Sequence, residues 1–578
     1  MTRRTTVLKF GGSVLQSDAD LPAAVNEIYR HWRQGSRVLA VVSAFGGRTD
    51  ELLRRANSFG PDRDDAATAS LLLTGEAESS SMLGLELGKV GIPAKVLTAH
   101  QISLQTRGDR LDAEPIWADT ARLENELNDG IVIVSGFGGV DSYGCPTLLG
   151  RGGSDFTALF LAERLDARCI LLKDVPGLYE CDPAESHRLP RRFDRASYAT
   201  AIQAGGPLIQ EKSVRFAEQH SIEIELGQIG ESVRTVVGSF QDSFAIESVD
   251  ARPLRVALLG CGTVGGGVFE RLSLQPETFE MIGVANRDRQ KAIAASIPHE
   301  LICRADDLLQ KDFDVLLELI GGSIDAYRYI RHSLESGKHV VTANKALMAE
   351  HGTELEDLAK LNGVSLRFSA AVGGVVPALE AARLRNGFGS PVAITGILNG
   401  TCNFICDRVE TGVSLDDAVL LAQEAGYAEA DPTVDLDGTD AAQKLALLAH
   451  AAFGYELPVR DIERKGIQEL CRQDLERAAA NGKTIRLIAE CRVENGHISA
   501  SVAPREVPFE DTFAGVRGAE NILTIRTDTG YEYTVRGRGA GRYATAESVI
   551  ADLFDIRRTL SASHKHTAVK VLAAEVGK

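Results

Sequence analysis

Short apolar runs that end in glycine recur through the first 180 residues. They lie at 5–13 (TTVLKFGGS), 37–47 (RVLAVVSAFGG), 131–139 (IVIVSGFGG) and 169–177 (CILLKDVPG). Helical stretches such as 21–34 separate them. This alternation predicts an α/β domain with a parallel sheet covered on both faces, and it gathers the glycine loops at the carboxyl ends of the strands, where such sheets bind ligands.

A second alternating pattern starts at residue 254. The segment 254–272 (LRVALLGCGTVGGGVFERL) predicts a buried strand, a glycine turn and a helix. Gly260, Gly262 and Gly265 form G-x-G-x-x-G, which lets a pyrophosphate rest on the helix N-terminus of a Rossmann fold. The next strand ends in Asn286, Arg287 and Asp288, where that fold reads the adenosine ribose. Arginine can pair with a 2′-phosphate, so the sequence favours NADP(H) over NAD(H); a solvated loop charge is the alternative for Arg287.

The rest of the chain mixes strands and helices and predicts an α+β domain whose final helices return to the dinucleotide domain. The predicted parts are a parallel-sheet domain (1–240), a linker (241–253), a Rossmann NAD(P)-binding domain (254–372), a substrate domain (373–535) and a C-terminal segment (536–578).

Composition narrows the partners. The chain has 578 residues, 44% hydrophobic and 25% charged, with a formal net charge of −17, which argues against nucleic acid or an anionic membrane as partner. It shows no apolar run of membrane-spanning length and no signal-peptide core, so a cytoplasmic protein is expected. The nine cysteines form no C-x-x-C pair, which favours free thiols over disulfides or zinc.

The most chemically dense stretch is 429–444, EADPTVDLDGTDAAQK. Its first half is broken by proline and glycine, and Thr439 onward predicts a helix on which Asp440 and Lys444 stand four apart on one face. In isolation this spacing is typical of a surface ion pair. The surrounding motifs decide between that interpretation and a catalytic one.

Several motifs in the first half resemble the catalytic domain of aspartate kinase: 9–13 (KFGGS), 41–53 (VVSAFGGRTDELL), 74–76 (TGE), 150–155 (GRGGSD) and 174–183 (DVPGLYECDP). The resemblance implies an amino-acid kinase fold that uses ATP with Mg²⁺. It implies Lys9 and Asp155 at the transferring phosphoryl group, Ser43, Thr49, Glu76, Arg151 and Ser154 around aspartate, and Asp174 and Tyr179 toward the nucleotide.

The chain departs from that family at several positions. The family usually has a lysine where Pro207 stands, a histidine where Gln210 stands and a threonine where Lys173 stands. Two hypotheses follow: an active aspartate kinase, or a non-catalytic kinase-like domain kept for assembly or ligand sensing. The short linker leaves no room for the two ACT domains that usually follow such a kinase, so feedback inhibition through them is predicted to be missing.

The second half resembles homoserine dehydrogenase. The matching motifs are 342–345 (TANK), 367–379 (RFSAAVGGVVPAL), 396–405 (GILNGTCNFI), 426–444 and 535–553 (VRGRGAGRYATAESVIADL). The resemblance implies reversible NAD(P)-dependent interconversion of aspartate 4-semialdehyde and homoserine, and a substrate domain that also makes a dimer surface. The expected partners are therefore these small molecules and aspartate, with further copies of the chain in a homo-oligomer.

The same resemblance assigns residues. It implies Lys444 in proton transfer, Lys345 near nicotinamide and substrate, Glu429 on the substrate amino group, and Asp435 and Asp440 in the substrate pocket. The implied cofactor residues are Gly260, Gly262, Thr263, Val264, Gly265, Arg287, Ile320, Gly321, Asn344, Lys345 and Gly541. Backbone carbonyls of Val372, Gly374 and Val376 match a sodium loop, although the expected glutamate is Ser369.

The sequence thus predicts a bifunctional aspartate kinase and homoserine dehydrogenase lacking ACT domains. The alternatives are a monofunctional homoserine dehydrogenase with a degenerate kinase-like half, and a regulator that binds NADP without turnover.

Overall fold

The computed structural model describes residues 3–181, 190–206, 208–245, 252–384 and 389–576. The chain divides into two compact units. The first unit comprises Met1–Lys89, Pro93–Val249 and Arg558–Lys578, and the second comprises Val90–Ile92 and Asp250–Arg557. Residues 246–251 of the predicted linker and Pro207 lie outside the described residues. The finer domain boundaries within the units stay predictions.

The first unit is built on a nine-stranded, mainly parallel sheet within the described residues, in the order β13-β10-β12-β11-β9-β1-β2-β6-β3. Its strands are β1 (Thr5–Phe10), β2 (Arg37–Val42), β3 (Ala94–Leu97), β6 (Ile131–Ser135), β9 (Arg168–Lys173), β10 (Phe193–Ser197), β11 (Ile224–Gln228), β12 (Arg234–Gly238) and β13 (Ser243–Phe244). A smaller sheet joins β4 (Gln105–Asp109), β5 (Asp112–Trp117), β7 (Gly138–Val140) and β8 (Pro146–Leu148).

Helices cover both faces of the large sheet. They are α1 (Leu21–Arg33), α2 (Arg48–Asn57), α3 (Asp65–Val90), α4 (Thr120–Asp129), α5 (Gly153–Arg164), α6 (Tyr198–Gly205) and α7 (Glu211–Gln219). The buried residues of α5 join those of β1, β2 and β9 in one core, and α3 covers the opposite face, where Gly84 approaches Ile133. Because side chains alternate along a strand, this arrangement decides which residues of β1 and β9 meet α5.

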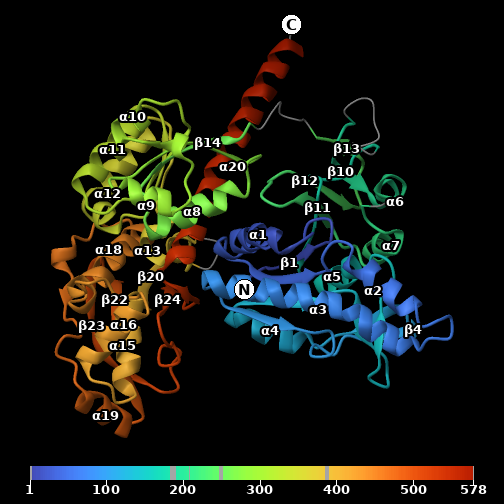
Figure 1. The fold of residues 1–578 in the computed structure, drawn as a ribbon, viewed down its shortest axis with the longest axis horizontal. Helices are drawn as coiled ribbons and strands as arrows, with labels where there is room; N and C mark the ends of the chain where they lie inside the picture. The colour runs from blue at the N-terminus through green and yellow to red at the C-terminus, as the bar shows by residue number, and fades with distance from the viewer. Residues whose placement is uncertain (1–2, 182–189, 207, 246–251, 385–388, 577–578) are drawn as a thin grey trace. The chain divides into compact units, whose positions relative to one another are not determined.

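The second unit begins with a six-stranded parallel sheet in the order β16-β15-β14-β17-β18-β19. Its elements are β14 (Leu254–Leu259), α8 (Thr263–Ser273), β15 (Phe279–Ala285), α9 (Arg289–Ala294), β16 (Ile302–Cys303), α10 (Ala305–Leu309), β17 (Val315–Glu318), α11 (Ile324–Glu335), β18 (His339–Thr342), α12 (Lys345–Leu361) and β19 (Leu366–Arg367). Figure 1 shows α10, α11 and α12 grouped beside the sheet that contains β14. This is the predicted Rossmann arrangement.

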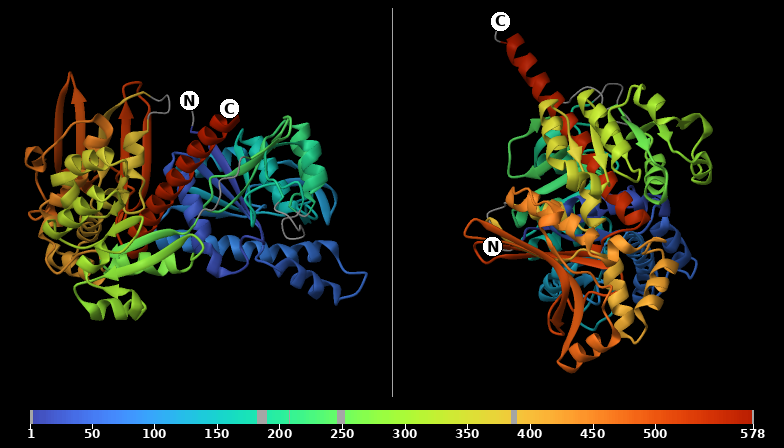
Figure 2. Two further views of the ribbon diagram at one scale, coloured as in Figure 1. Left: turned by 90° about the horizontal axis from the view of Figure 1, so that it is seen from above. Right: turned by 90° about the vertical axis from the view of Figure 1, so that its left-hand side faces the viewer.

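A second, mostly antiparallel sheet follows in the order β21-β23-β22-β20-β24-β25. Its strands are β20 (Pro391–Ile397), β21 (Glu463–Arg464), β22 (Lys483–Glu494), β23 (His497–Pro508), β24 (Glu520–Thr527) and β25 (Glu532–Arg538), and the helices around it are α13 (Ser369–Gly373), α14 (Ala378–Arg383), α15 (Gly400–Glu410), α16 (Leu415–Glu424), α17 (Thr433–Leu436), α18 (Thr439–Phe453) and α19 (Arg472–Ala480). Figure 2 shows its long strands with helices packed along one face. The predicted fold class, a parallel-sheet kinase-like domain, a Rossmann domain and an α+β domain, is confirmed.

The last helix, α20 (Arg542–Val576), starts beside the Rossmann sheet. Arg542 pairs with Glu270 of α8 at 3.0 Å, and Phe554 stacks edge-on against Phe279 with ring centroids 5.1 Å apart. Among the residues described, no helix is long and apolar enough to cross a membrane.

Candidate functional site

A cavity of about 840 Å³ in the second unit lies where the Rossmann strands end and the α+β part begins. The predicted site residues that line it are Val264, Ile320, Gly321, Lys345, Glu429, Asp435, Asp440, Lys444 and Gly541. The first and last of these residues are nearly 280 positions apart in the chain. The fold therefore brings together residues whose proximity the sequence does not show.

The centre of this cavity is a buried carboxylate held by two lysines. Gly438 takes a left-handed conformation (φ +80°) and starts α18, which puts Asp440 in the first turn and Lys444 one turn later. Lys345 at the start of α12 lies 3.0 Å from one carboxylate oxygen of Asp440, and Lys444 lies 3.0 Å from the other. Asp440 is only 4% exposed, so the pair at 440 and 444 is not a surface ion pair.

Asn399 completes this cluster, and sequence reasoning missed it. Its amide nitrogen donates to Asp435 at 2.7 Å and to Asp440 at 2.8 Å, while its amide oxygen caps α15 by accepting from Cys402 N–H. Lys444 also donates to the carbonyl of Leu398 at 2.8 Å. The available signal was an asparagine before a helix within the motif 396–405, but a cap alone does not predict two carboxylate partners.

The charges explain the protonation states. Burial alone would raise the pKa of Asp440, but the ammonium groups of Lys444 and Lys345 hold it well below its usual range. The carboxylate of Asp440 in turn raises the pKa of Lys345. Burial and the neighbouring Asp440 raise the pKa of Asp435. The cluster therefore presents a charged Lys345 beside a carboxylate that stays ionised.

The glycine turn after β14 is shaped for close approach of a ligand. Gly260 has φ +96°, and a Cβ on Gly265 would lie 1.9 Å from the carbonyl oxygen of Gly260, so both positions require glycine. Gly262 precedes α8 with open space around it, and Thr263 is the first residue of that helix. An N-terminus opened in this way suits a pyrophosphate.

The other implied cofactor residues lie at neighbouring strand ends. Asn344 caps α12 by accepting from Leu347 N–H, and it donates to the carbonyl of Gly322 at 2.8 Å. Arg287 follows β15, has a side chain that is 79% exposed, and pairs with Asp325. Asp288 caps α9 by accepting from Gln290 N–H at 2.9 Å. Arg287 and Asn344 do not line the cavity around Asp440.

Glu318, at the end of β17, is a second buried acid that sequence reasoning missed. It accepts from the hydroxyl of Thr342 and from Ile320 N–H, so it ties the end of β17 to the end of β18. Burial raises its pKa to about 7. Nothing in the apolar run 313–320 distinguishes this glutamate from a strand-end residue that reaches solvent.

The residues of the implied sodium loop fit that ion poorly. Ser369 stands where the glutamate was expected, and its hydroxyl lies within hydrogen-bonding distance of the carboxylates of Glu380, at 2.7 Å, and Asp552, at 3.0 Å, and donates to one of them. The carbonyl of Val376 already accepts from Ala378 N–H. Gly374 has φ +55° and lies against the backbone of Gly539. We therefore derive no step through sodium, and among the residues described no group of three or more His, Cys, Asp or Glu is placed to hold a metal ion.

The first unit holds its own cavity, of about 890 Å³. It gathers Lys9, Ser43, Thr49, Glu76, Arg151, Ser154 and Asp155, the residues assigned to phosphoryl transfer and aspartate. Lys9 lies 2.7 Å from a carboxylate oxygen of Asp155. Asp174 and Tyr179 do not line this cavity. Gln210 lies over Gly152, whose Cβ would meet the Gln210 side chain at 2.4 Å.

Glu76 is a buried acid of this cavity with one carboxylate oxygen that has no partner among the described residues. It is 2% exposed, and its Oε2 atom has no hydrogen-bond partner in the described part of the chain. Burial raises its pKa to about 7. A buried acceptor without a partner is costly. A cationic group of a ligand would supply the missing partner.

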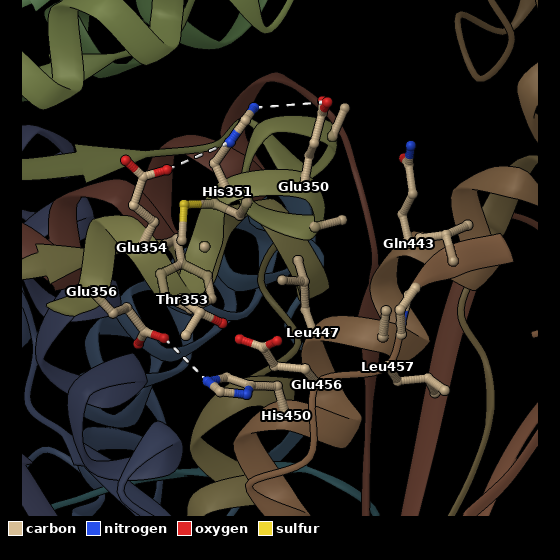
Figure 3. Close-up of a pocket in the computed structure, with 18 of the residues that line it drawn as sticks. Glu350, His351, Thr353, Glu354, Glu356, Gln443, Leu447, His450, Glu456 and Leu457 are labelled. Carbon is tan, nitrogen blue, oxygen red and sulfur yellow. Dashed lines mark ion pairs between the residues drawn. The ribbon is translucent and has the colours of Figure 1, made fainter. Parts of the chain in front are cut away.

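A third cavity, of about 590 Å³, lies between α12 and α18 (Figure 3). Ion pairs lie in it: His450 lies 3.3 Å from Glu356, and His351 lies 3.8 Å from Glu354. The hydrogen bond to Glu356 raises the pKa of His450. Within the described part of the chain, this third cavity is not lined by Lys345, Asp440 or Lys444, and it has no glycine turn. We therefore place the candidate site in the cavity around Asp440.

Comparisons with known proteins agree with this division. Residues 4–226 match the amino acid kinase family, residues 260–369 match the NAD-binding domain of homoserine dehydrogenase, and residues 377–554 match homoserine dehydrogenase. A homoserine dehydrogenase of Pseudomonas aeruginosa is 37% identical over 321 residues, which cover 54% of this chain and 74% of that protein.

Two further relatives bear on the second half. An "NAD(+)-dependent homoserine dehydrogenase" of Pseudomonas canavaninivorans is 37% identical over 243 residues, covering 42% of this chain and 69% of that protein. The crystal structure of a homoserine dehydrogenase from Thiobacillus denitrificans has a TM-score of 0.52 and 36% identity, covering 55% of this chain and 75% of that one.

Proposed function

This chain belongs to the homoserine dehydrogenase family, and we propose how the residues of its second unit carry out the reduction of aspartate 4-semialdehyde to homoserine and its reversal. The observation that supports the assignment of roles is the Lys345–Asp440–Lys444 cluster inside the cavity that also reaches Val264, Ile320 and Gly541. NAD(P)H, when bound, supplies the hydride.

In this proposal Lys444 gives a proton to the carbonyl oxygen of the substrate. Hydride addition to an aldehyde develops negative charge on that oxygen, and an ammonium group beside it stabilises the charge and can supply the proton. Lys444 is 6% exposed and held by Asp440 and the Leu398 carbonyl, so its position is fixed before substrate arrives. In the reverse direction the same amine accepts the hydroxyl proton of homoserine.

The acidic residues around the lysines would bind the substrate's amino group. Glu429 is exposed at the cavity wall, and Asp435 is kept beside Asp440 by Asn399. Lys345, at the start of α12, lines the same cavity as these acids and as Ile320 and Gly321, which follow β17. We assign Glu429 and Asp435 to the ammonium group and Lys345 to orienting Asp440 and the substrate.

We propose NADP(H) as the favoured cofactor. Arg287 is exposed at the end of β15, where a 2′-phosphate would lie, and the carboxylate of Asp288 is occupied in capping α9. Asp325, which pairs with Arg287, is the competing contact that a 2′-phosphate would replace. The NAD(+)-dependent relative makes NAD(H) the alternative.

Replacing Lys444 tests the dehydrogenase roles. We expect Lys444→Met to lower kcat for NADPH-dependent reduction of aspartate semialdehyde by about 100-fold or more, the scale of a lost general acid, while the Kd for NADPH stays near the wild-type value. Lys465→Met, at a lysine with a 69% exposed side chain, is the matched control. Wild-type protein that binds NADPH without consuming it would instead favour the regulator hypothesis.

We further propose that the first unit is an aspartate kinase, which with the second unit would catalyse the first and third steps from aspartate to homoserine. The supporting observation is that one cavity unites Lys9 and Asp155 with the five residues assigned to aspartate. Glu76 would take the ammonium group of aspartate, and Arg151 is suited to grip a carboxylate in two-point fashion. Mg²⁺ and ATP belong to this proposal, as does a place in threonine and methionine biosynthesis. The cytoplasmic location and the homo-oligomer stay predictions.

The kinase proposal is tested with the full chain. ATP, Mg²⁺ and aspartate are supplied with hydroxylamine, which traps the acyl phosphate as a coloured hydroxamate. We expect hydroxamate that depends on all three components and is lost in Asp155→Asn. Folded wild-type protein that forms none would support the non-catalytic alternative.

A further inference from the structure

Lys173 is a buried lysine in the first unit that the functional proposal does not yet use. It is the last residue of β9 and is 7% exposed. Its Nζ atom lies 3.0 Å from the Oδ2 atom of Asp155, and the Nζ atom of Lys9 lies 2.7 Å from Oδ1. One carboxylate is therefore shared by two ammonium groups.

The sheet register explains how the two lysines meet. β1 and β9 are parallel neighbours in which Lys9 is level with Leu171. Side chains two apart on a strand share a face, so Lys173 points to the same face as Lys9, one pleat further along. Asp155, in the first turn of α5, lies above that face and receives both.

The charges of this trio do not cancel. With both lysines protonated, two ammonium groups and one carboxylate leave one positive charge in a site whose three side chains are each at most 8% exposed. Burial lowers the pKa of Lys9, and the carboxylate of Asp155 opposes that shift. Burial would raise the pKa of Asp155, but Lys173 and Lys9 lower it to about 2, so the carboxylate stays ionised. An uncompensated buried charge is unfavourable unless a ligand of opposite sign completes the site.

The remaining positive charge lies on Lys9, beside the glycine turn at Gly11 and Gly12. Lys9 lines the cavity, whereas Lys173 does not. The Nζ atom of Lys9 lies 2.9 Å from the position of a Cβ on Gly11, so it reaches the backbone of the turn Gly11–Gly12. If Lys9 alone faced Asp155, the carboxylate would neutralise it. With Lys173 on the second oxygen, the charge of Lys9 is available to an anion.

We propose that Lys173 is a positioning residue of the phosphoryl-transfer centre: it neutralises Asp155 so that Lys9 can hold the transferring phosphoryl group. This inference rests on the proposed kinase function. In that step a β-carboxylate oxygen of aspartate forms a bond to the γ-phosphorus of ATP, the bond from that phosphorus to the bridging oxygen breaks, and ADP leaves with the electron pair. No proton is transferred. The developing charge on the phosphoryl oxygens is what a lysine must offset.

Lys173 also compensates for a position at which this chain differs from the aspartate kinase family. Such enzymes are expected to have threonine at position 173 and a lysine at position 207, where this chain has proline. Proline cannot supply an ammonium group. Lys173 adds an ammonium group from β9 that pairs with Asp155 and leaves the charge of Lys9 available, and this is why we expect the kinase centre to work despite the substitution at 207.

The test compares Lys173→Met, which keeps the length of the side chain but removes the charge, with Lys173→Arg, which keeps the charge. Hydroxamate formation gives kcat and the KM values for aspartate and ATP from pH 5 to 9, and dehydrogenase turnover of the same preparation reports an intact second unit. We expect Lys173→Met to lower kcat about tenfold or more, with KM for aspartate near wild type. We also expect the acid limb of the kcat–pH profile to move to higher pH. Asp155 has then lost one of its two neighbouring cations, so its pKa rises. Lys173→Arg should recover part of kcat.

Other outcomes overturn the inference. Wild-type kcat and pH profile in Lys173→Met would do so, and so would a parallel rise of KM for aspartate, which would indicate a merely structural lysine. If the wild type forms no hydroxamate, the kinase proposal fails separately. Calorimetric binding of the ATP analogue AMP-PNP with Mg²⁺ then decides: about tenfold weaker binding to Lys173→Met retains Lys173 as part of an anion site, whereas equal binding, or no binding to the wild type, overturns it.

Discussion

At the residue scale, the chemistry proposed for the second unit centres on a single carboxylate. Asp440 is in contact with Lys345, Lys444 and Asn399, so both of its oxygens have partners. Removing one partner of a buried ion pair costs about 3–5 kcal/mol, because the other charge is left without compensation. Asp440 therefore orients both lysines, and a change at any member of the cluster is expected to disturb the others.

Arg287 carries the cofactor prediction. Arg287→Ala should raise KM for NADPH about tenfold or more, since a charge-assisted contact to the 2′-phosphate is lost, and should change KM for NADH little. The measurement is dehydrogenase kinetics with both cofactors. Arg289→Ala, two residues later, is the control. Equal effects of Arg287→Ala on both cofactors would mean that the guanidinium serves only its contact with Asp325.

The sequence could identify several residues of the site but not their partners. Motifs placed Lys345, Asp440 and Lys444 in one pocket, and the structure brings them within hydrogen-bonding distance. Asn399 was missed because its partners are 36 and 41 residues away, and they become neighbours only because α15 packs against α17, which leads into the first turn of α18. The spacing of residues along the sequence predicts which side chains share a face of one helix. This cluster instead joins side chains from α12, α18 and the start of α15.

At the element scale, the strand ends of the Rossmann sheet are tied together by a buried acid. β17 and β18 are parallel neighbours, with Glu318 level with Thr342. Glu318 links the backbone at Ile320, beside the cavity, to the turn that leads into α12 and Lys345. The position of Lys345 thus depends on a group that does not itself line the cavity.

The raised pKa of Glu318 predicts a pH effect on stability. Its pKa rises from 4.5 to about 7 on folding, so between these values the folded state holds a proton that the unfolded state has released. The contribution to stability is complete below pH 4.5 and is lost as pH rises toward 7, by up to about 3 kcal/mol. Urea unfolding followed by circular dichroism should show this loss between about pH 4.5 and 7 in the wild type and a smaller one in Glu318→Gln. Glu335→Gln, at an exposed glutamate, should behave as wild type.

The elements were easier to predict than their partners. Buried strands that end in glycine, and a G-x-G-x-x-G turn, carry local signals for a parallel sheet, and both parallel sheets are present. The order of the antiparallel sheet, with β20 between β22 and β24, depends on pairing across about 100 residues. No local pattern specifies such long-range register.

At the scale of the whole molecule, each proposed activity has a cavity built from one unit alone. The cavity around Lys9 is lined by residues of the first unit, and the cavity around Asp440 by residues of the second. Neither set of reacting groups borrows a residue from the other. Distinct chemistry on one chain is therefore expected to be separable by single substitutions.

Paired variants test this separation. Asp155→Asn should abolish hydroxamate formation and leave dehydrogenase turnover within about twofold of wild type, and Lys444→Met should do the reverse; distant sites with no shared partners act independently. Both assays are run on each variant at matched protein concentration. Loss of both activities from either substitution would show that the sites depend on each other.

The two contacts of Lys444 also bear on stereochemistry. An ammonium group has three N–H donors in a tetrahedral arrangement. Asp440 and the Leu398 carbonyl take two of them, so the direction of the third is fixed by the protein. When the aldehyde oxygen of the substrate accepts this third N–H, the plane of the aldehyde group takes a fixed orientation relative to the cofactor. One face of the aldehyde then meets the hydride, and we expect deuteride from labelled NADPH to appear in a single configuration at the alcohol carbon of homoserine.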